Sequence, residues 1–214
     1  MASPPMTSLR ELEQASLAIE NKDAEHNRHY GKWLRMLIAP GGSLGGARPK
    51  ASVIDENKQL WIAKFPSLYD DIDVGVWEML AYQLGETAGI VMPKSILKQF
   101  NGRHHTFLSQ RFDRTPYNNR IHFASAMTLL QYQDGDDAAS GVSYLHLAEF
   151  LMREGAEPDK DLEQLWKRIL FFVCISNVDD HLRNHGFLLQ PNGWVLSPAY
   201  DINPVAHADG LKLN

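Results

Sequence analysis

Side chains near the C-terminus have the types and spacing needed for acid–base and metal chemistry. In the segment SNVDDHLRNHGFLL, Asp179 precedes Asn184 by five residues, and a further carboxylate, Asp201, follows in LSPAYD. A carboxylate can accept the proton of a reacting hydroxyl group. Carboxylate and amide oxygens are the ligands that a hard cation such as Mg²⁺ prefers. Asp180 and His181 are alternative candidates for the base.

A glycine-rich loop, APGGSLGGARPK at residues 39–50, precedes an expected β-hairpin with strands at 51–54 and 60–65. It is not a Walker A loop, because no Gly-Lys-Ser/Thr follows at the required spacing. Nor is it a dinucleotide-binding fingerprint, because a strand follows it instead of a helix. A glycine loop before a hairpin can bind ATP phosphates through its backbone amides, as in protein kinases. A mobile surface loop is the alternative.

Lys64 ends the second strand of this hairpin among apolar neighbours, where a lysine is costly to bury unpaired. Glu78 lies on the next expected helix, at the edge of its apolar stripe. A strand lysine paired with a helix glutamate contacts the α- and β-phosphates of ATP in kinases, and the spacing from Asp179 to Asn184 is that of the kinase catalytic loop. The alternative for Lys64 is a lysine that reaches from the strand end into solvent.

The pattern predicts a β-rich N-terminal lobe and a helical C-terminal lobe, joined near residues 111–114. We expect residues 1–6 to be disordered and residues 22–30 to be a polar linker. The expected helices are 7–21, 74–88, 145–152 and 162–173, and the further strands are 90–100, 105–111, 186–189 and 194–196. The expected domains are an N-terminal helix and linker (1–30), an N-lobe (31–114) and a partial C-lobe (115–214).

SNVDDHLRNHGFLL followed by LSPAYDINP, with GGSLGGARPKASV, WIAKFPS and QRFDR upstream, resembles the HipA family of bacterial serine/threonine kinases. These are toxins of toxin–antitoxin modules, and the likeness runs from about residue 40 to the C-terminus. It implies an α+β, two-lobed protein-kinase-like fold with an incomplete C-lobe. It also implies ATP and Mg²⁺ as cofactors, and transfer of the ATP γ-phosphate to a protein hydroxyl.

The same resemblance implies the roles of individual residues. Asp179 is the catalytic base, and Asn184 and Asp201 bind magnesium. Ser43 matches the loop serine that such kinases autophosphorylate, which switches the enzyme off. The implied ATP-binding residues, with Gln110 and Phe112 at the hinge that holds adenine, are Lys64, Glu78, Gln110, Phe112, Gly45 and Gly46.

The family's protein substrates are typically translation factors such as aminoacyl-tRNA synthetases, and its partner is a HipB-like helix-turn-helix antitoxin. Members usually carry a further N-terminal subdomain and more C-terminal helices. The alternative function is therefore a catalytically inactive, truncated kinase-like module that contacts an antitoxin or another protein. A metal-dependent phosphohydrolase using Asp179, Asp180, His181 and His185 is a third hypothesis, but the turn-like sequence and Gly186 argue against a helix there.

Composition limits the remaining possibilities. With 21 Lys+Arg against 26 Asp+Glu the net charge is −5, so we expect no direct contact with nucleic acid. The longest apolar run, Ile169 to Ile175, is too short to span a bilayer, and no signal peptide is visible. We therefore expect a cytoplasmic protein without a membrane contact. The single cysteine, Cys174, is expected to be a buried apolar side chain.

Overall fold

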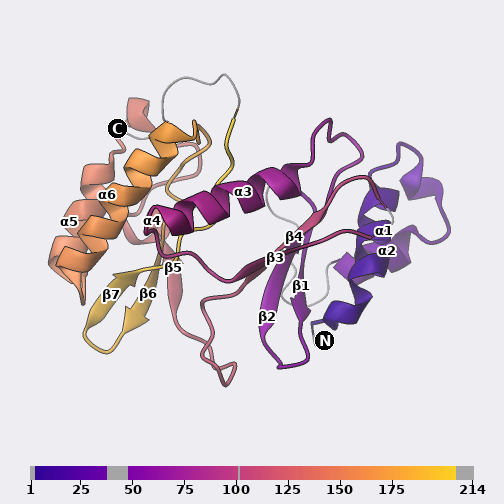
Figure 1. Cartoon of the computed structure of the whole chain (residues 1–214), viewed down its shortest axis with the longest axis horizontal. Helices are drawn as coiled ribbons and strands as arrows, with labels where there is room; N and C mark the ends of the chain where they lie inside the picture. The colour runs from indigo at the N-terminus through magenta and orange to yellow at the C-terminus, as the bar shows by residue number, and fades with distance from the viewer. Residues whose placement is uncertain (1–2, 38–47, 101, 206–214) are drawn as a thin grey trace. The chain divides into compact units, whose positions relative to one another are not determined.

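The computed structural model describes residues 3–37, 48–100 and 102–205 (Figure 1). The chain forms two units. The first consists of Met1–Met79 with Lys94–Asn118, and the second of Leu80–Pro93 with Asn119–Asn214. Helix α3 begins in the first unit and ends in the second.

The first unit contains a four-stranded antiparallel sheet in the order β1-β2-β4-β3. The predicted hairpin is confirmed as β1 and β2, which pair from Lys50 with Lys64 to Ile54 with Leu60. The elements that begin in this unit are η1 (Met6–Ser8), α1 (Leu9–Ile19), η2 (Ala24–His26), α2 (Tyr30–Leu37), β1 (Lys50–Ile54), β2 (Leu60–Lys64), α3 (Val74–Thr87), β3 (Ser95–Lys98) and β4 (Thr106–Gln110).

Helices α1 and α2 cover one face of this sheet. Leu9, Leu12 and Leu37 form one apolar core with the buried strand residues, among them Trp61 and Ala63 of β2. Successive side chains of a strand point to opposite faces. Lys64, the neighbour of Ala63, therefore lies on the sheet face away from α1 and α2.

Three expectations for the N-terminal half of the chain are corrected. Residues 3–6 are ordered, because the Ile54 amide donates to the Pro4 carbonyl at 2.9 Å and Pro5 forms a bridge with Ile54. Helix α2 was not anticipated. The expected strand 90–100 is shortened to β3, because the Val91 amide donates to the Gln164 side chain at 2.9 Å instead of to a strand.

The second unit contains the three-stranded antiparallel sheet β5-β6-β7 and the helices that pack on it. The predicted helices 145–152 and 162–173 and both predicted strands are confirmed, whereas β5 and α4 were not anticipated. The elements are β5 (Phe123–Ser125), α4 (Ala126–Leu129), η3 (Ala138–Ser140), α5 (Tyr144–Glu154), α6 (Pro158–Cys174), β6 (Gly186–Gln190) and β7 (Gly193–Leu196).

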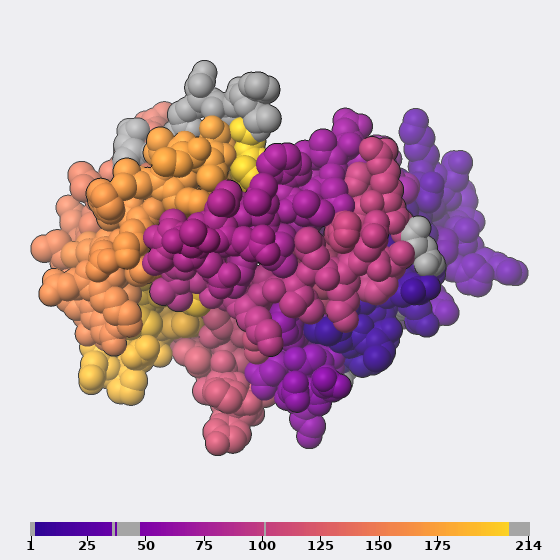
Figure 2. All heavy atoms as spheres, in the orientation of Figure 1, coloured from indigo at the N-terminus to yellow at the C-terminus, as the bar shows by residue number. Residues whose placement is uncertain are grey.

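The helix patterns predicted the elements better than the faces that they bury. Trp77 and Leu84 stand at helical spacing with the buried Ala81 of α3 but are each 47% exposed, and α3 forms part of the surface visible in Figure 2. Trp166 on α6 is 61% exposed. Cys174 is exposed as well, so the expectation of a buried cysteine is wrong: it follows Val173 on the solvent side of α6. Among the described helices none is long and apolar enough to cross a membrane.

A buried carboxyl on α1 makes the stability of the first unit depend on pH. Glu13 is 2% exposed. Burial raises its pKa, although the hydroxyl of Thr106, 2.5 Å away, and the charge of Arg10 oppose that shift. A carboxyl whose pKa is raised by folding binds its proton more tightly in the native state. Its ionisation therefore lowers the free energy of unfolding as the pH rises.

We expect Glu13→Gln to raise the free energy of unfolding at pH 7, because the amide still accepts from Thr106 without a buried charge. The gain should shrink as the pH falls through the raised native pKa of Glu13 and vanish well below about 4.3, the ordinary pKa of glutamate, where the carboxyl is protonated in both states. Urea unfolding of both proteins at several pH values measures this. Glu11→Gln, at an exposed position of the same helix, is the control. An equal gain at every pH would contradict the assignment.

Candidate active site

Lys64 and Glu78 form a buried ion pair in the first unit. The Nζ atom of Lys64 lies 2.5 Å from Oε1 of Glu78, and the two side chains are 13% and 6% exposed. The Lys64 ammonium also lies 5.9 Å from the centroid of the Phe107 ring. Burying an ammonium is costly unless it is paired. Glu78 therefore offsets the cost of burying Lys64, and the structure brings together two of the predicted ATP-binding residues.

The start of α3 is held close to the end of the loop before β4, and this places Glu78. Asp73 accepts hydrogen bonds from the amide of His105 and lies 2.6 Å from its Nδ1 atom. Burial acts to raise the pKa of Asp73, but the bonds with His105 hold it below its usual range. A Cβ atom on Gly75 would lie 2.4 Å from the His105 carbonyl oxygen. Only glycine permits this approach of helix and backbone.

Gln110 and Phe112, the predicted hinge residues, lie at the end of β4 and just after it. The Gln110 amide donates to the Lys94 carbonyl at 2.8 Å, and the Arg111 amide donates to the Leu60 carbonyl at 2.8 Å. Both amides are therefore used within the first unit. Adenine would have to be bound through other backbone groups of this segment.

Sequence reasoning did not single out the ion-pair network that follows β4. Arg111 donates to Asp113 through Nε at 2.8 Å and Nη2 at 2.6 Å, and Arg114 Nη1 lies 2.8 Å from the same carboxylate. Burial acts to raise the pKa of Asp113, but the two guanidinium groups hold it below its usual range. The paired charges fix the course of the chain directly after the predicted hinge.

The predicted residues of the glycine-rich loop, Ser43, Gly45 and Gly46, lie outside the described residues. Arg48, near the C-terminal end of the loop, forms two hydrogen bonds with Asp70, at 2.9 Å and 2.5 Å. Such bidentate pairs fix geometry as well as charge. This ion pair therefore anchors the chain where the loop leads into β1.

Asp179 and Asp180 are neighbours in the second unit but lie in opposite environments. Asp179 is exposed, whereas Asp180 has no exposed surface. The Tyr144 hydroxyl donates to Asp180 Oδ2 at 2.6 Å, and His185 Nε2 lies 2.8 Å from the same oxygen. A carboxylate enclosed in this way cannot meet the hydroxyl of another protein. The geometry therefore favours Asp179 over Asp180 as the candidate base.

The sequence does not indicate that Tyr144 and His185, the buried partners of Asp180, have a structural role. Burial raises the pKa of Tyr144 far above its ordinary value, and the charge of Asp180 adds to this, so the hydroxyl remains a donor. The sequence pattern suggests His185 only as a metal ligand. Residues 177–185 are not helical, so His181 and His185 do not share a helix face. Among the described residues no three His, Cys, Asp or Glu side chains are grouped to hold a metal ion.

Asn184 and Asp201 offer oxygen atoms to a cation. The Asn184 Nδ2 atom donates to the Asp179 carbonyl at 3.1 Å, which fixes which end of the amide carries the acceptor Oδ1. Asp201 has φ = 57°, a left-handed conformation that non-glycine residues adopt rarely and often at functional sites. Mg²⁺ is commonly held by one or two such side chains together with nucleotide phosphates. This donor set therefore fits Mg²⁺ bound together with ATP.

A buried arginine on α6 supports the segment that carries Asp201. Arg168 is 1% exposed, and its guanidinium donates to the Ser197 carbonyl. Burial lowers the pKa of Arg168 to about 10, although nearby acidic groups oppose the shift, so it is still charged at pH 7. The sequence contains one signal for this role. Arg168 falls at helical spacing with Leu165 and Phe172, on the buried face of α6, where an arginine is unexpected.

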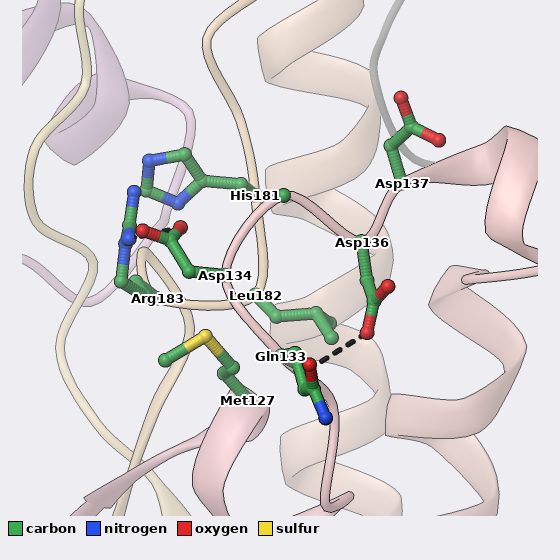
Figure 3. Close-up of a pocket in the computed structure, with 9 residues that line it drawn as sticks. Met127, Gln133, Asp134, Asp136, Asp137, His181, Leu182 and Arg183 are labelled. Carbon is green, nitrogen blue, oxygen red and sulfur yellow. Dashed lines mark hydrogen bonds and ion pairs between the residues drawn. The ribbon is translucent and has the colours of Figure 1, made fainter.

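A pocket of about 200 Å³ borders the loop that carries Asp179 and Asn184 (Figure 3). Asp134 and Arg183, which both line it, form an ion pair, and the carboxylate of Asp136 accepts a hydrogen bond from the backbone amide of Gln133 at 2.7 Å. Its lining residues are Met127, Gln133, Asp134, Gly135, Asp136, Asp137, His181, Leu182 and Arg183.

Two solved structures share this fold. A structure of the Shewanella oneidensis MR-1 toxin–antitoxin system HipA, HipB and its operator DNA matches with a TM-score of 0.62 and 21% identity, over 75% of this chain and 43% of that chain. The Helicobacter pylori proinflammatory kinase CtkA matches with a TM-score of 0.55 and 16% identity, over 72% of this chain and 54% of that chain. The chain therefore has the α+β, two-lobed protein-kinase-like fold.

The sequence itself shows to which protein family the chain belongs. The model of the HipA-like C-terminal domain matches residues 42–214, and the chain belongs to this family. A Haemophilus influenzae protein described as "Putative kinase" is 24% identical over 184 residues, which are 78% of this chain. The match covers 53% of that protein, so the chain spans about half the length of this curated relative. The predicted HipA family and the α+β, two-lobed protein-kinase-like fold are confirmed.

Proposed function

We propose that this protein is a serine/threonine protein kinase of the HipA type, which transfers the γ-phosphate of Mg²⁺-bound ATP to a protein hydroxyl. The observation that carries the proposal is the Lys64–Glu78 ion pair. A buried ion pair often stabilises a fold no more than well-packed apolar side chains of similar size would. The Lys64–Glu78 pair lies on the sheet face away from α1 and α2. Phosphate binding explains this buried pair better than a contribution to the stability of the fold does.

In this proposal each side chain has one task. Lys64 contacts the α- and β-phosphates, while Asn184 and Asp201 hold the cation through oxygen atoms. The bound cation would neutralise charge on the phosphates. Asp179 accepts the proton of the attacking hydroxyl as the new O–P bond forms and the bond from the γ-phosphorus to ADP breaks.

Partners and regulation follow from family membership and belong to the same proposal. The Shewanella relative was solved with HipB and operator DNA, and we propose a HipB-like antitoxin as the partner of this protein. The substrate class is a protein such as a translation factor. Autophosphorylation of Ser43, and contacts from Gly45 and Gly46 to the phosphates, are also proposed.

Nucleotide binding tests the proposal first. We expect calorimetry to show one ATP bound per chain with Mg²⁺ present, and at least tenfold weaker binding with EDTA, because the cation links the phosphates to the protein. GTP serves as the control for nucleotide selectivity. If ATP binds no better with Mg²⁺ than without, the assignment of Asn184 and Asp201 as cation ligands is wrong. Binding without any phosphoryl transfer would instead support the inactive module.

A further inference from the structure

The two candidate cation ligands lie on different segments of the second unit, and one side chain connects these segments. Asn184 directly follows Arg183, and Asp201 directly follows Tyr200. The Tyr200 hydroxyl donates to the Arg183 carbonyl at 2.6 Å. This one hydrogen bond therefore runs from the residue before one ligand to the residue before the other.

Both ends of this connection are held in place. The side chain of Arg183 is paired with Asp134, as Figure 3 shows. The amide of Asn184 donates to the His181 carbonyl at 2.8 Å, which closes the turn. On the other segment, the ring of Tyr200 packs edge-on against Phe123, with centroids 6.3 Å apart. The hydrogen bond therefore joins two segments that are each fixed to their own surroundings.

We infer that Tyr200 is a positioning residue that sets the separation of Asn184 and Asp201, so that both bind one Mg²⁺ ion. This inference rests on the proposed function. Mg²⁺ requires near-ideal octahedral geometry at short distances, whereas Ca²⁺ accepts longer and more variable ones. Changing the residues that orient metal ligands typically lowers metal affinity 10–100-fold. Loss of the Tyr200 hydroxyl should therefore lower the affinity for Mg²⁺ more than the affinity for Ca²⁺.

The test measures cation binding to Tyr200→Phe, which keeps the ring against Phe123 and removes only the hydroxyl. Mn²⁺ is titrated into the full chain with a non-hydrolysable ATP analogue and followed by electron paramagnetic resonance. Mg²⁺ and Ca²⁺ then compete for the Mn²⁺ site. The matched control is Tyr132→Phe, because the Tyr132 hydroxyl lies 3.2 Å from His146 Nδ1 in the same unit.

We expect Tyr200→Phe to lower the affinity for Mg²⁺ by about tenfold and the affinity for Ca²⁺ by less. The affinity for the ATP analogue in EDTA should be unchanged. Tyr132→Phe should behave like the wild type. Equal weakening of both cations, or cation binding like that of the wild type, would overturn the inference while leaving the proposed function intact. If the wild type itself binds no Mn²⁺ with the analogue, the proposed function fails, and the inference fails with it.

Discussion

Replacing Lys64 by methionine and Glu78 by glutamine together is expected to weaken ATP binding roughly ten- to a hundredfold. A hydrogen bond to a charged group contributes about 1.5–3 kcal/mol, and each 1.4 kcal/mol is a factor of about ten in affinity. The double variant is preferable to Lys64→Met. Removing one partner leaves the Glu78 carboxylate, only 6% exposed, buried without its counter-ion, which costs about 3–5 kcal/mol.

Calorimetry with Mg²⁺ and ATP measures this loss. Lys98→Met is the matched control: Lys98 follows Leu97, which is in register with Phe107, so Lys98 lies on the opposite face of the same sheet from Lys64. We expect the control to bind ATP like the wild type. ATP affinity that is unchanged in a folded double variant would show that Lys64 does not contact the nucleotide.

Asp179→Asn is expected to reduce phosphoryl transfer by roughly 10²–10⁴-fold, the range that a general base contributes. Because Asp179 is exposed and Asn184 bonds to its backbone carbonyl, the substitution should leave folding and ATP affinity unchanged. The measurement is the initial rate of phosphate transfer from labelled ATP, with the melting temperature recorded in parallel.

The variant Asp180→Asn, at the neighbouring position, should destabilise the fold, unlike Asp179→Asn. It removes a fully buried charge that Tyr144 and His185 contact, and bonds to charged groups are strong. We therefore expect a melting temperature lowered by several degrees. A large loss of transfer in a stable Asp180→Asn, with a normal rate in Asp179→Asn, would show that the assignment is shifted by one residue.

Much of the fold was predictable because it depends on local patterns. The hairpin of β1 and β2 follows from two apolar runs around a polar turn, and α6 follows from its helical spacing. The face that each helix buries depends on distant segments. The exposure of Trp166 and Cys174 therefore could not be predicted from α6 alone. The order of residues 3–6 depends likewise on Ile54, about fifty residues away.

The candidate site shows the same division. Asp179 was selected by its spacing from Asn184, and Lys64 and Glu78 by their places on an apolar strand and the next helix. The structure shows that Lys64 and Glu78 meet. The sequence does not show which of two adjacent aspartates is buried, because Asp180 is enclosed by Tyr144, 36 residues earlier. The hydrogen bond from Tyr200 to the Arg183 carbonyl has no sequence signature, since any residue offers a carbonyl group.

Phosphoryl transfer by the unsubstituted chain tests the central claim most directly. The purified protein is incubated with γ-labelled ATP and Mg²⁺, alone and with a soluble protein extract, beside Asp179→Asn as the matched control. We predict label on serine or threonine side chains, identified by mass spectrometry, in the wild-type reactions only. Equal labelling with Asp179→Asn, or no labelled protein from a chain that binds Mg²⁺ and ATP, would contradict the proposed kinase activity.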